Sequence, residues 1–129
     1  MNDIKGNAGL DYTGGGVVAT TEDLLKFMKA LVKYQIVKKD ILDEMKNNRA
    51  KFGLGINYGY GIWEIATVPL LMPKKFNSWG VAGATGSFMF YHREMDAYLI
   101  GSFNDFSYER KGIRFMLLNV INQLSKYNG

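Results

Sequence analysis

The sequence predicts an α+β fold: an antiparallel sheet with a C-terminal covering helix, preceded by two helices. Three observations carry this prediction. Apolar residues recur at helical spacing over residues 20–47, strand-like segments follow between residues 58 and 103, and residues 107–126 carry a long amphipathic stripe. A chain of 129 residues is long enough to bury one core. We therefore expect a single domain over 1–129, helical over 1–50 and built of sheet plus terminal helix over 51–129.

The first helix is expected to begin at Thr20 or Thr21, where a hydroxyl at the N-cap is followed by acidic residues. A second helix is expected over residues 39–47. Residues 14–16, three successive glycines, predict a flexible turn before both helices. The apolar positions of the two helices are Leu24, Phe27, Met28, Leu31 and Val32 in the first, and Ile41, Leu42 and Met45 in the second.

Strands are expected over residues 58–66, 79–82, 87–91 and 97–103. The last two are separated by five residues, a length that suits a hairpin. The final helix is the clearest element, because its apolar residues follow the spacing i, i+3, i+4, i+7, i+8, i+11. They are Ile113, Met116, Leu117, Val120, Ile121 and Leu124.

Composition excludes several classes of function. The chain has no cysteine, so it has neither a disulfide framework nor a cysteine nucleophile. No apolar run approaches the roughly 18 residues of a membrane helix, so no membrane segment is expected in this chain. The net charge is +4, and five lysines lie between positions 26 and 39. They could form an anionic-surface patch, but a solvated helix face is favoured, because no nucleic-acid motif accompanies them. No nucleic-acid partner is expected.

Side chains suited to catalysis or to binding a metal are few. His92, the single histidine, lies between two expected strands beside Arg93 and Glu94, and we expect a surface histidine rather than a general base. Glu64, Asp96 and Asp105 are isolated in sequence, and the expectation for each is a solvated carboxylate. No cluster has the spacing of metal ligands, so neither a metal nor a cofactor is expected.

Two glycine-rich segments, residues 53–55 and 80–86, lack the Gly-Lys-Ser/Thr of a phosphate-binding loop. The spacing of their glycines, taken alone, predicts turns and packing contacts. Together with other segments, however, they carry a family resemblance. Residues 11–27, 58–63, 80–91 and 98–104 resemble, in order, segments of the serine β-lactamase-related family. That family includes class C β-lactamases, DD-peptidases and related esterases, and the similarity covers the chain from about residue 11 to residue 124.

The resemblance implies a partial β-lactamase/transpeptidase-like fold, corresponding to the C-terminal part of a two-lobed hydrolase. In the family, a Ser-x-x-Lys helix supplies the nucleophile and a Tyr-x-Asn motif follows. A third motif, Lys-Thr-Gly or His-Thr-Gly, holds the substrate carboxylate, and a backbone amide just beyond it helps to bind the oxyanion.

This sequence departs from that pattern, because it contains neither Ser-x-x-Lys nor Tyr-x-Asn. The third-motif position reads Val81, Ala82 and Gly83, and the amide of Ala84 stands at the expected oxyanion position. A valine carries no charge and an alanine side chain donates no hydrogen bond. Residues 81–84 are therefore expected to be the remnant of a substrate groove, and no catalytic residue is expected.

We expect the chain to be a C-terminal fragment of a β-lactamase-related serine hydrolase that is inactive alone. The alternative is a degenerate, non-catalytic binding or oligomerisation module of the same fold. An independent enzyme of another kind is less favoured, because no acid–base pair stands out. A peptide or β-lactam-like ligand would belong to the full-length parent. Relatives are often exported or associated with the cell envelope, but residues 1–7 have no apolar signal core, so localisation stays unassigned.

A homo-oligomer is also expected. The missing parts of the resembled fold would leave an open sheet edge and an uncovered apolar face, drawn from residues such as Ile62, Phe88, Phe90 and Tyr98. The rival outcome is a monomer whose two N-terminal helices fold back over that face.

Overall fold

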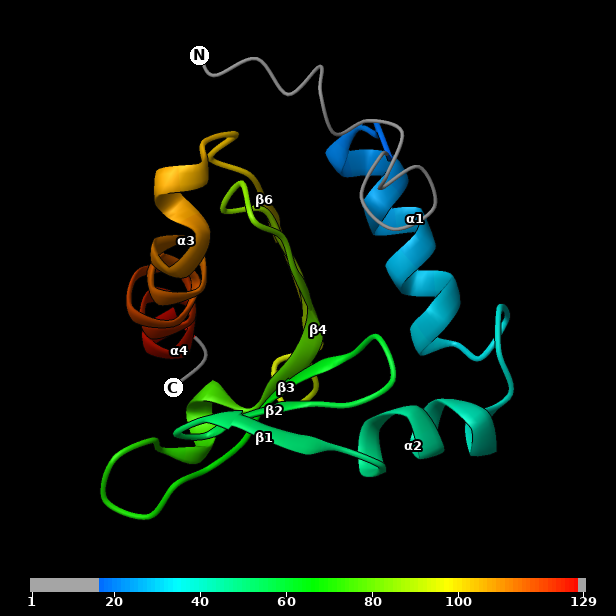
Figure 1. Cartoon of the computed structure of the whole chain (residues 1–129), viewed down its shortest axis with the longest axis horizontal. Coiled ribbons are helices and arrows are strands. Elements are labelled where there is room, and N and C mark those ends of the chain that lie inside the picture. Colours follow the sequence, from blue (N-terminus) through cyan, green and yellow to red (C-terminus); the bar gives the residue numbers. More distant parts are fainter. Residues whose placement is uncertain (1–16, 128–129) are drawn as a thin grey trace.

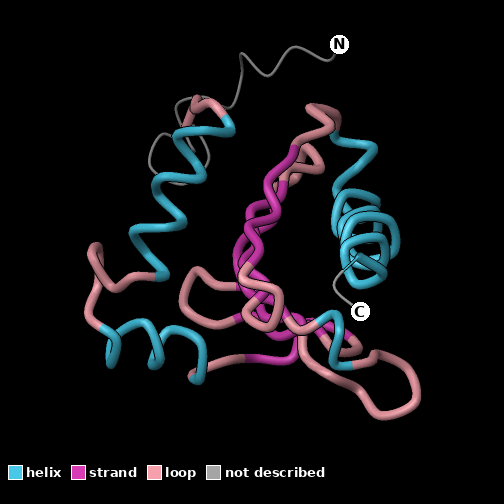
Figure 2. The backbone as a smooth tube through the Cα atoms, turned by 180° about the vertical axis from the view of Figure 1, so that it is seen from behind, coloured by secondary structure: helices cyan, strands magenta, loops and turns pink. Residues whose placement is uncertain are grey.

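The computed structural model describes residues 17–127, in which six strands form one antiparallel sheet in the order β1-β2-β3-β4-β5-β6. The sheet lies between two helical layers, with α1 on one face and the C-terminal helix on the other (Figures 1 and 2). The predicted α+β class is therefore confirmed. The strands are β1 (Ala50–Gly53), β2 (Ile56–Tyr58), β3 (Trp63–Ile65), β4 (Ser78–Ala82), β5 (Phe88–His92) and β6 (Ala97–Gly101).

Helix α1 (Thr21–Val32) begins where the capping residues predict. The Thr20 side chain accepts a hydrogen bond from the amide of Asp23 at 3.1 Å and donates one to its carboxylate at 2.7 Å. Met28 is buried, whereas Phe27 is 47% exposed. The helix packs against β5 and β6. The turn expected at residues 14–16 lies outside the described residues.

Helix α2 (Lys39–Asn47) has the predicted bounds and buries Leu42. Its C-terminal end rests on the turn between β2 and β3, where the amide of Tyr60 donates to the carbonyl of Met45 at 3.0 Å. Gly59 is in close contact with the same carbonyl and leaves no space there for a Cβ.

The prediction of one strand over residues 58–66 is wrong, because a tight turn interrupts it. The amide of Gly59 donates to the carbonyl of Ile62 at 2.7 Å, and Gly61 has a φ of +70°. The chain therefore reverses between β2 and β3. Strand β1 was not predicted, but the expected turn over residues 53–55 is confirmed, since Gly55, with a φ of +69°, closes the β1–β2 hairpin.

Strands β4, β5 and β6 match their predictions closely, and β5 and β6 form the expected hairpin. Between β3 and β4 the chain makes an isolated bridge from Val68 to Met72 and then a short 3-10 turn, η2 (Lys74–Phe76).

The C-terminal helix has the predicted extent but is not uniform. It comprises a 3-10 turn η3 (Phe106–Tyr108), α3 (Glu109–Phe115), a π-helical segment η4 (Met116–Ile121) and α4 (Asn122–Tyr127). Met116 and Ile121 are both fully buried, and the wider π turn lets two residues five positions apart face the sheet. The remaining residues of the predicted stripe, Ile113, Leu117, Val120 and Leu124, pack around the same core.

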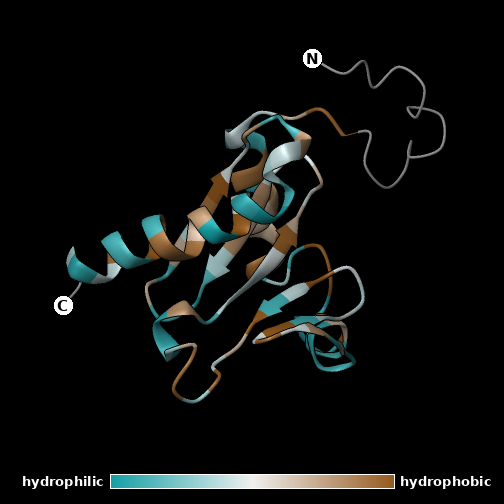
Figure 3. Cartoon of the chain, turned by 60° about the vertical axis from the view of Figure 1, so that its left-hand side comes forward, coloured by the Kyte–Doolittle hydropathy of each residue, from teal (hydrophilic) through white to brown (hydrophobic). Residues whose placement is uncertain are grey.

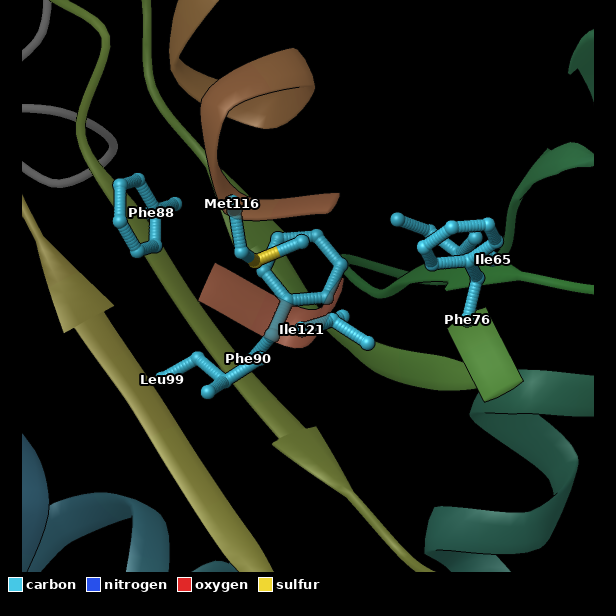
Figure 4. Packing of buried hydrophobic residues seen from close by; sticks show 7 residues of the cluster. All are labelled: Ile65, Phe76, Phe88, Phe90, Leu99, Met116 and Ile121. Atoms are coloured by element: carbon cyan, nitrogen blue, oxygen red, sulfur yellow. The ribbon is translucent and has the colours of Figure 1, made fainter. Parts of the chain in front are cut away.

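The core lies between the C-terminal helix and the sheet (Figure 4). Its buried members are Ile65, Phe76, Phe88, Phe90, Leu99, Met116 and Ile121. In Figure 3 the strands show apolar stretches among neutral and polar ones, whereas the end of the C-terminal helix is largely polar.

The expectation of an uncovered apolar face is wrong. Ile62, Phe88 and Phe90 are 4%, 7% and 0% exposed. The C-terminal helix covers the two phenylalanines, and on the other face the ammonium of Lys29 lies 5.9 Å from the centre of the half-buried Tyr98 ring. Both faces of the β5–β6 hairpin are thus packed within the described residues.

Candidate functional site

The groove remnant predicted at residues 81–84 lies where β4 runs past the end of its neighbour. Strand β3 pairs with β4 only as far as Gly80, which lies opposite Trp63. Val81 and Ala82 continue to pair with β5 on the other side, opposite Met89 and Phe88. Beyond Gly80, the β3-facing edge of β4 therefore has no strand partner among the described residues.

The backbone of the following turn is closely held. The amide of Gly83 donates to the carbonyl of Ser87 at 2.9 Å, and that of Gly86, with a φ of +72°, donates to Gly83 at 3.1 Å. The amide of Ala84, by contrast, donates to no acceptor within residues 17–127, and Ala84 is exposed. One backbone donor of the turn is therefore left without an acceptor among the described residues, at the position where the resemblance places an oxyanion contact.

Helix α3 packs directly on this turn. A Cβ on Gly112 would lie 2.6 Å from the carbonyl oxygen of Gly86, so the two backbones approach as only glycines allow. A Cβ on Gly86 would lie 2.7 Å from the Cβ of Tyr108. The amide of Asp105 also donates to the carbonyl of Thr85 at 3.1 Å. Three contacts from the C-terminal part of the chain therefore fix the position of the turn.

Beside the turn is an apolar groove of about 670 Å³. The groove lies between the C-terminal helix, the β1–β3 hairpins and the loop that contains Leu71 and Met72. Ala82, Gly83 and Ala84 form part of its wall, and Val81 does not. Three of the four predicted residues are thus brought together at one hollow, and the fourth, 39% exposed, lies on the free edge of β4.

Aromatic and aliphatic side chains make up most of the remaining wall. Phe52 packs edge-on against Trp63 with ring centroids 4.7 Å apart, and Ile113 and Leu117 approach from the helix. Charged groups come from α3 alone, namely Glu109, Arg110 and Arg114. The wall contains no serine, threonine, lysine, histidine or tyrosine, so the described residues place no hydroxyl nucleophile in the groove, and Glu109 is its one carboxylate.

His92 is not the surface residue that was expected. It ends β5 and is 1% exposed. Its Nε2 lies 2.7 Å from the carbonyl oxygen of Lys75, and its Nδ1 lies 3.3 Å from the amide of Met95. An amide can only donate and a carbonyl can only accept, so these partners require the proton on Nε2. Both ring nitrogens are engaged in holding the β5–β6 turn against η2.

The three isolated carboxylates are also occupied structurally. Glu64 forms an ion pair with Arg49 and accepts from the side chain of Asn57 at 3.3 Å. Asp96 accepts from the hydroxyl of Tyr91 at 2.9 Å; burial and this bond raise the tyrosine pKa. Asp105 accepts from the amide of Ser107 at 2.8 Å, and this hydrogen bond lowers the pKa of the carboxyl. Each of the three contributes to local structure.

A second hollow, of about 540 Å³, lies on the opposite side, between the first two helices and the sheet. Its charges are largely paired. Asp43 lies 2.8 Å from Lys39 and 3.0 Å from Lys46, and Lys46 also lies 5.3 Å from the centre of the Trp79 ring. Hydrogen bonds from the two lysines lower the pKa of Asp43 to about 2. Both ion pairs lie within α2 and stabilise the helix itself, whereas the contact of Lys46 with the Trp79 ring joins α2 to β4.

Sequence reasoning missed the far wall of the groove. Phe52 and Leu71 belong to a hairpin and a loop that carry no strong pattern, and Arg110 and Arg114 are four residues apart on a helix, which is an ordinary surface spacing. Only the fold brings them opposite Ala82.

Within residues 17–127, no group of acidic, histidine or cysteine side chains could hold a metal ion, and no helix has the length and hydropathy to cross a membrane. No family model, curated protein or solved structure matches the chain.

Proposed function

We propose that this chain is the C-terminal, sheet-bearing part of a β-lactamase-related serine hydrolase, and that it is catalytically inactive alone. The observation that supports the proposal is the geometry at the end of β4. A strand edge without a partner beyond Gly80 is followed by an unbonded amide at Ala84, beside an apolar groove. An enzyme that binds an acyl substrate along a strand and stabilises its oxyanion needs this combination.

Hydrolysis by this family also needs a serine nucleophile and its lysine base, and the groove wall has neither a serine nor a lysine. In this proposal the missing groups come from a Ser-x-x-Lys helix outside the chain, and a peptide or β-lactam-like compound is the ligand of the complete protein. Alone, the chain retains a donor for the oxyanion but no group that attacks the carbonyl carbon.

A second candidate is a degenerate binding module that has lost hydrolysis. Val81 and Ala82 favour it, because neither side chain holds a substrate carboxylate as the third motif of the family does. The apolar wall of the groove would then bind an acyl or aromatic group, with the edge of β4 taking up an extended peptide.

The activity test is intact-mass spectrometry after incubation with benzylpenicillin, alongside hydrolysis of a chromogenic cephalosporin. The expected result is an unchanged mass and background hydrolysis. A covalent penicilloyl adduct would contradict the proposal, because it would require a nucleophile within the chain.

Reading the coding sequence upstream separates the two candidates. A Ser-x-x-Lys segment in the same frame supports the hydrolase part, and its absence supports the degenerate module. Binding can be followed through Trp63, which lies in the groove wall, in a Trp79→Phe variant that leaves it the sole tryptophan. A change in its emission with an acylated D-Ala-D-Ala peptide is expected for the module, and no change in emission would contradict it.

A further inference from the structure

The outer edge of β6 has no strand partner within the part of the chain that the structure describes. Strand β6 is the last in the sheet, and its backbone groups pair only with β5 among residues 17–127. In an antiparallel ladder, alternate residues direct their N–H and C=O groups to either side of a strand. One row of these groups in β6 therefore faces away from the sheet, available to a further strand.

The opposite edge of the sheet is protected from such pairing. Strand β1 has four residues, all of them exposed, and its register shifts between Lys51 and Gly53. A short strand, a bulge and a lysine are the usual means by which an edge avoids recruiting another chain. Strand β6 has none of these, since Ala97, Tyr98, Leu99, Ile100 and Gly101 include no charge, no proline and no break in register.

The sequence of β6 is complementary to itself. If two copies run antiparallel with Leu99 on a two-fold axis, Tyr98 of each lies opposite Ile100 of the other, and Ala97 lies opposite Gly101. Aromatic and β-branched side chains form favourable cross-strand pairs, and the small residues meet at the ends without crowding. The same register keeps Leu99 of both copies facing the side of the C-terminal helix, where it is already buried.

We propose that the outer edge of β6 binds a second copy of this chain, forming a two-fold dimer with one continuous sheet through both protomers. A second copy of the chain fits this edge, because the five residues of β6 can pair antiparallel with the same five residues of the partner and no charged side chain is left without a counterpart. The proposal concerns this edge alone and does not depend on the family assigned to the chain.

Sedimentation equilibrium over a wide range of concentration tests the proposal. The unmodified chain is expected to dimerise. Ile100→Lys is expected to raise the dimer dissociation constant about tenfold or more, because it puts a lysine in place of the isoleucine in both symmetry-related Tyr98–Ile100 pairs. The matched control is Phe52→Lys, which places the same charge on the protected edge and should leave dimerisation unchanged. A monomer at tens of micromolar, or a dimer indifferent to Ile100→Lys, would overturn the proposal.

Cross-linking tests the register and does not rely on the folding of the lysine variant. The chain has no cysteine, so Tyr98→Cys and Ile100→Cys each introduce a single thiol. An equal mixture of the two variants should form a mixed disulfide faster than either variant alone, because position 98 faces position 100 across the axis. Lys51→Cys on the protected edge is the control and should stay reduced. Equal rates for the mixture and the separate variants would contradict this pairing.

Discussion

Strands β4, β5 and β6 have five residues each and pair without a break, whereas β1, β2 and β3 have three or four residues and include a register shift. The first group bears the buried side chains Phe88, Phe90 and Leu99, with a helix on each face. In the second, Ile65 is the one strand residue among the buried core members, and the partly buried Trp63 packs against them.

The groove wall draws on both halves, since Ala82 comes from the β4–β6 half and Phe52 from the β1–β3 half. One wall is therefore fixed by the main core and by the glycine contact with α3. The other depends on a small hairpin held by the Phe52–Trp63 contact and the ion pair between Arg49 and Glu64. The free energy of local opening should differ accordingly, with the hairpin wall opening more readily than the turn wall.

The largest expected effect comes from truncating one phenylalanine in each half. Phe90→Ala should lower the free energy of unfolding by about 3–5 kcal/mol, because Phe90 is fully buried and its removal leaves a cavity. Phe52→Ala should cost about 1 kcal/mol, because Phe52 is 69% exposed and loses mainly its edge-on contact with Trp63. Urea denaturation at one protein concentration measures both, and similar losses would show that the two halves contribute equally.

The difference between the halves also separates what sequence could predict from what it could not. In the β4–β6 half the signals are local: Phe88 and Phe90 alternate along β5, and the terminal helix carries a full apolar stripe. Both elements were predicted within a residue or two. In the β1–β3 half, three-residue strands are too short to show alternation, and the glycines at 59 and 61 make a turn in a segment that otherwise resembles one strand.

The burial of His92 was indicated by the alternation of β5, but its charged neighbours in the sequence favoured exposure. Positions 88, 90 and 92 share one face of β5, so the period of the strand places the histidine on the side of Phe88 and Phe90. The charged neighbours Arg93 and Glu94 suggested exposure instead. For the site, residues 81–84 were singled out from a linear sequence pattern, whereas the groove beside them depends on contacts between segments distant in sequence.

A smaller effect is expected from glycine substitutions in the two halves. Gly112→Ala should cost roughly 1–3 kcal/mol, because its Cβ would be forced against the Gly86 backbone, which cannot yield as a flexible side chain can. Gly53→Ala should change stability by no more than about 0.5 kcal/mol, since nothing lies within 4 Å of a Cβ there. Thermal unfolding of both variants provides the comparison. A tolerated Gly112→Ala would mean that α3 does not fix the turn at residues 83–86.

The smallest expected effect is electrostatic and concerns α2, the helix whose C-terminal end contacts the turn between β2 and β3 in the β1–β3 half. Hydrogen bonds from Lys39 and Lys46 lower the pKa of Asp43 from 3.8 to about 2. A carboxyl whose pKa is lower in the folded state stabilises that state above its unfolded pKa. This contribution should therefore be complete above about pH 4 and disappear as the pH falls from about 3.8 towards 2.

Urea midpoints measured between pH 5 and pH 2 for the unmodified chain and for Asp43→Asn isolate this group, because the other carboxyls titrate in both proteins. The difference between the two midpoints should be modest, since the pair is exposed, and should shrink over that interval. High salt at pH 5 should reduce the same difference by screening the charges. A difference that stays constant from pH 5 to pH 2 would mean that the carboxylate charge of Asp43 does not stabilise α2 through its two lysines.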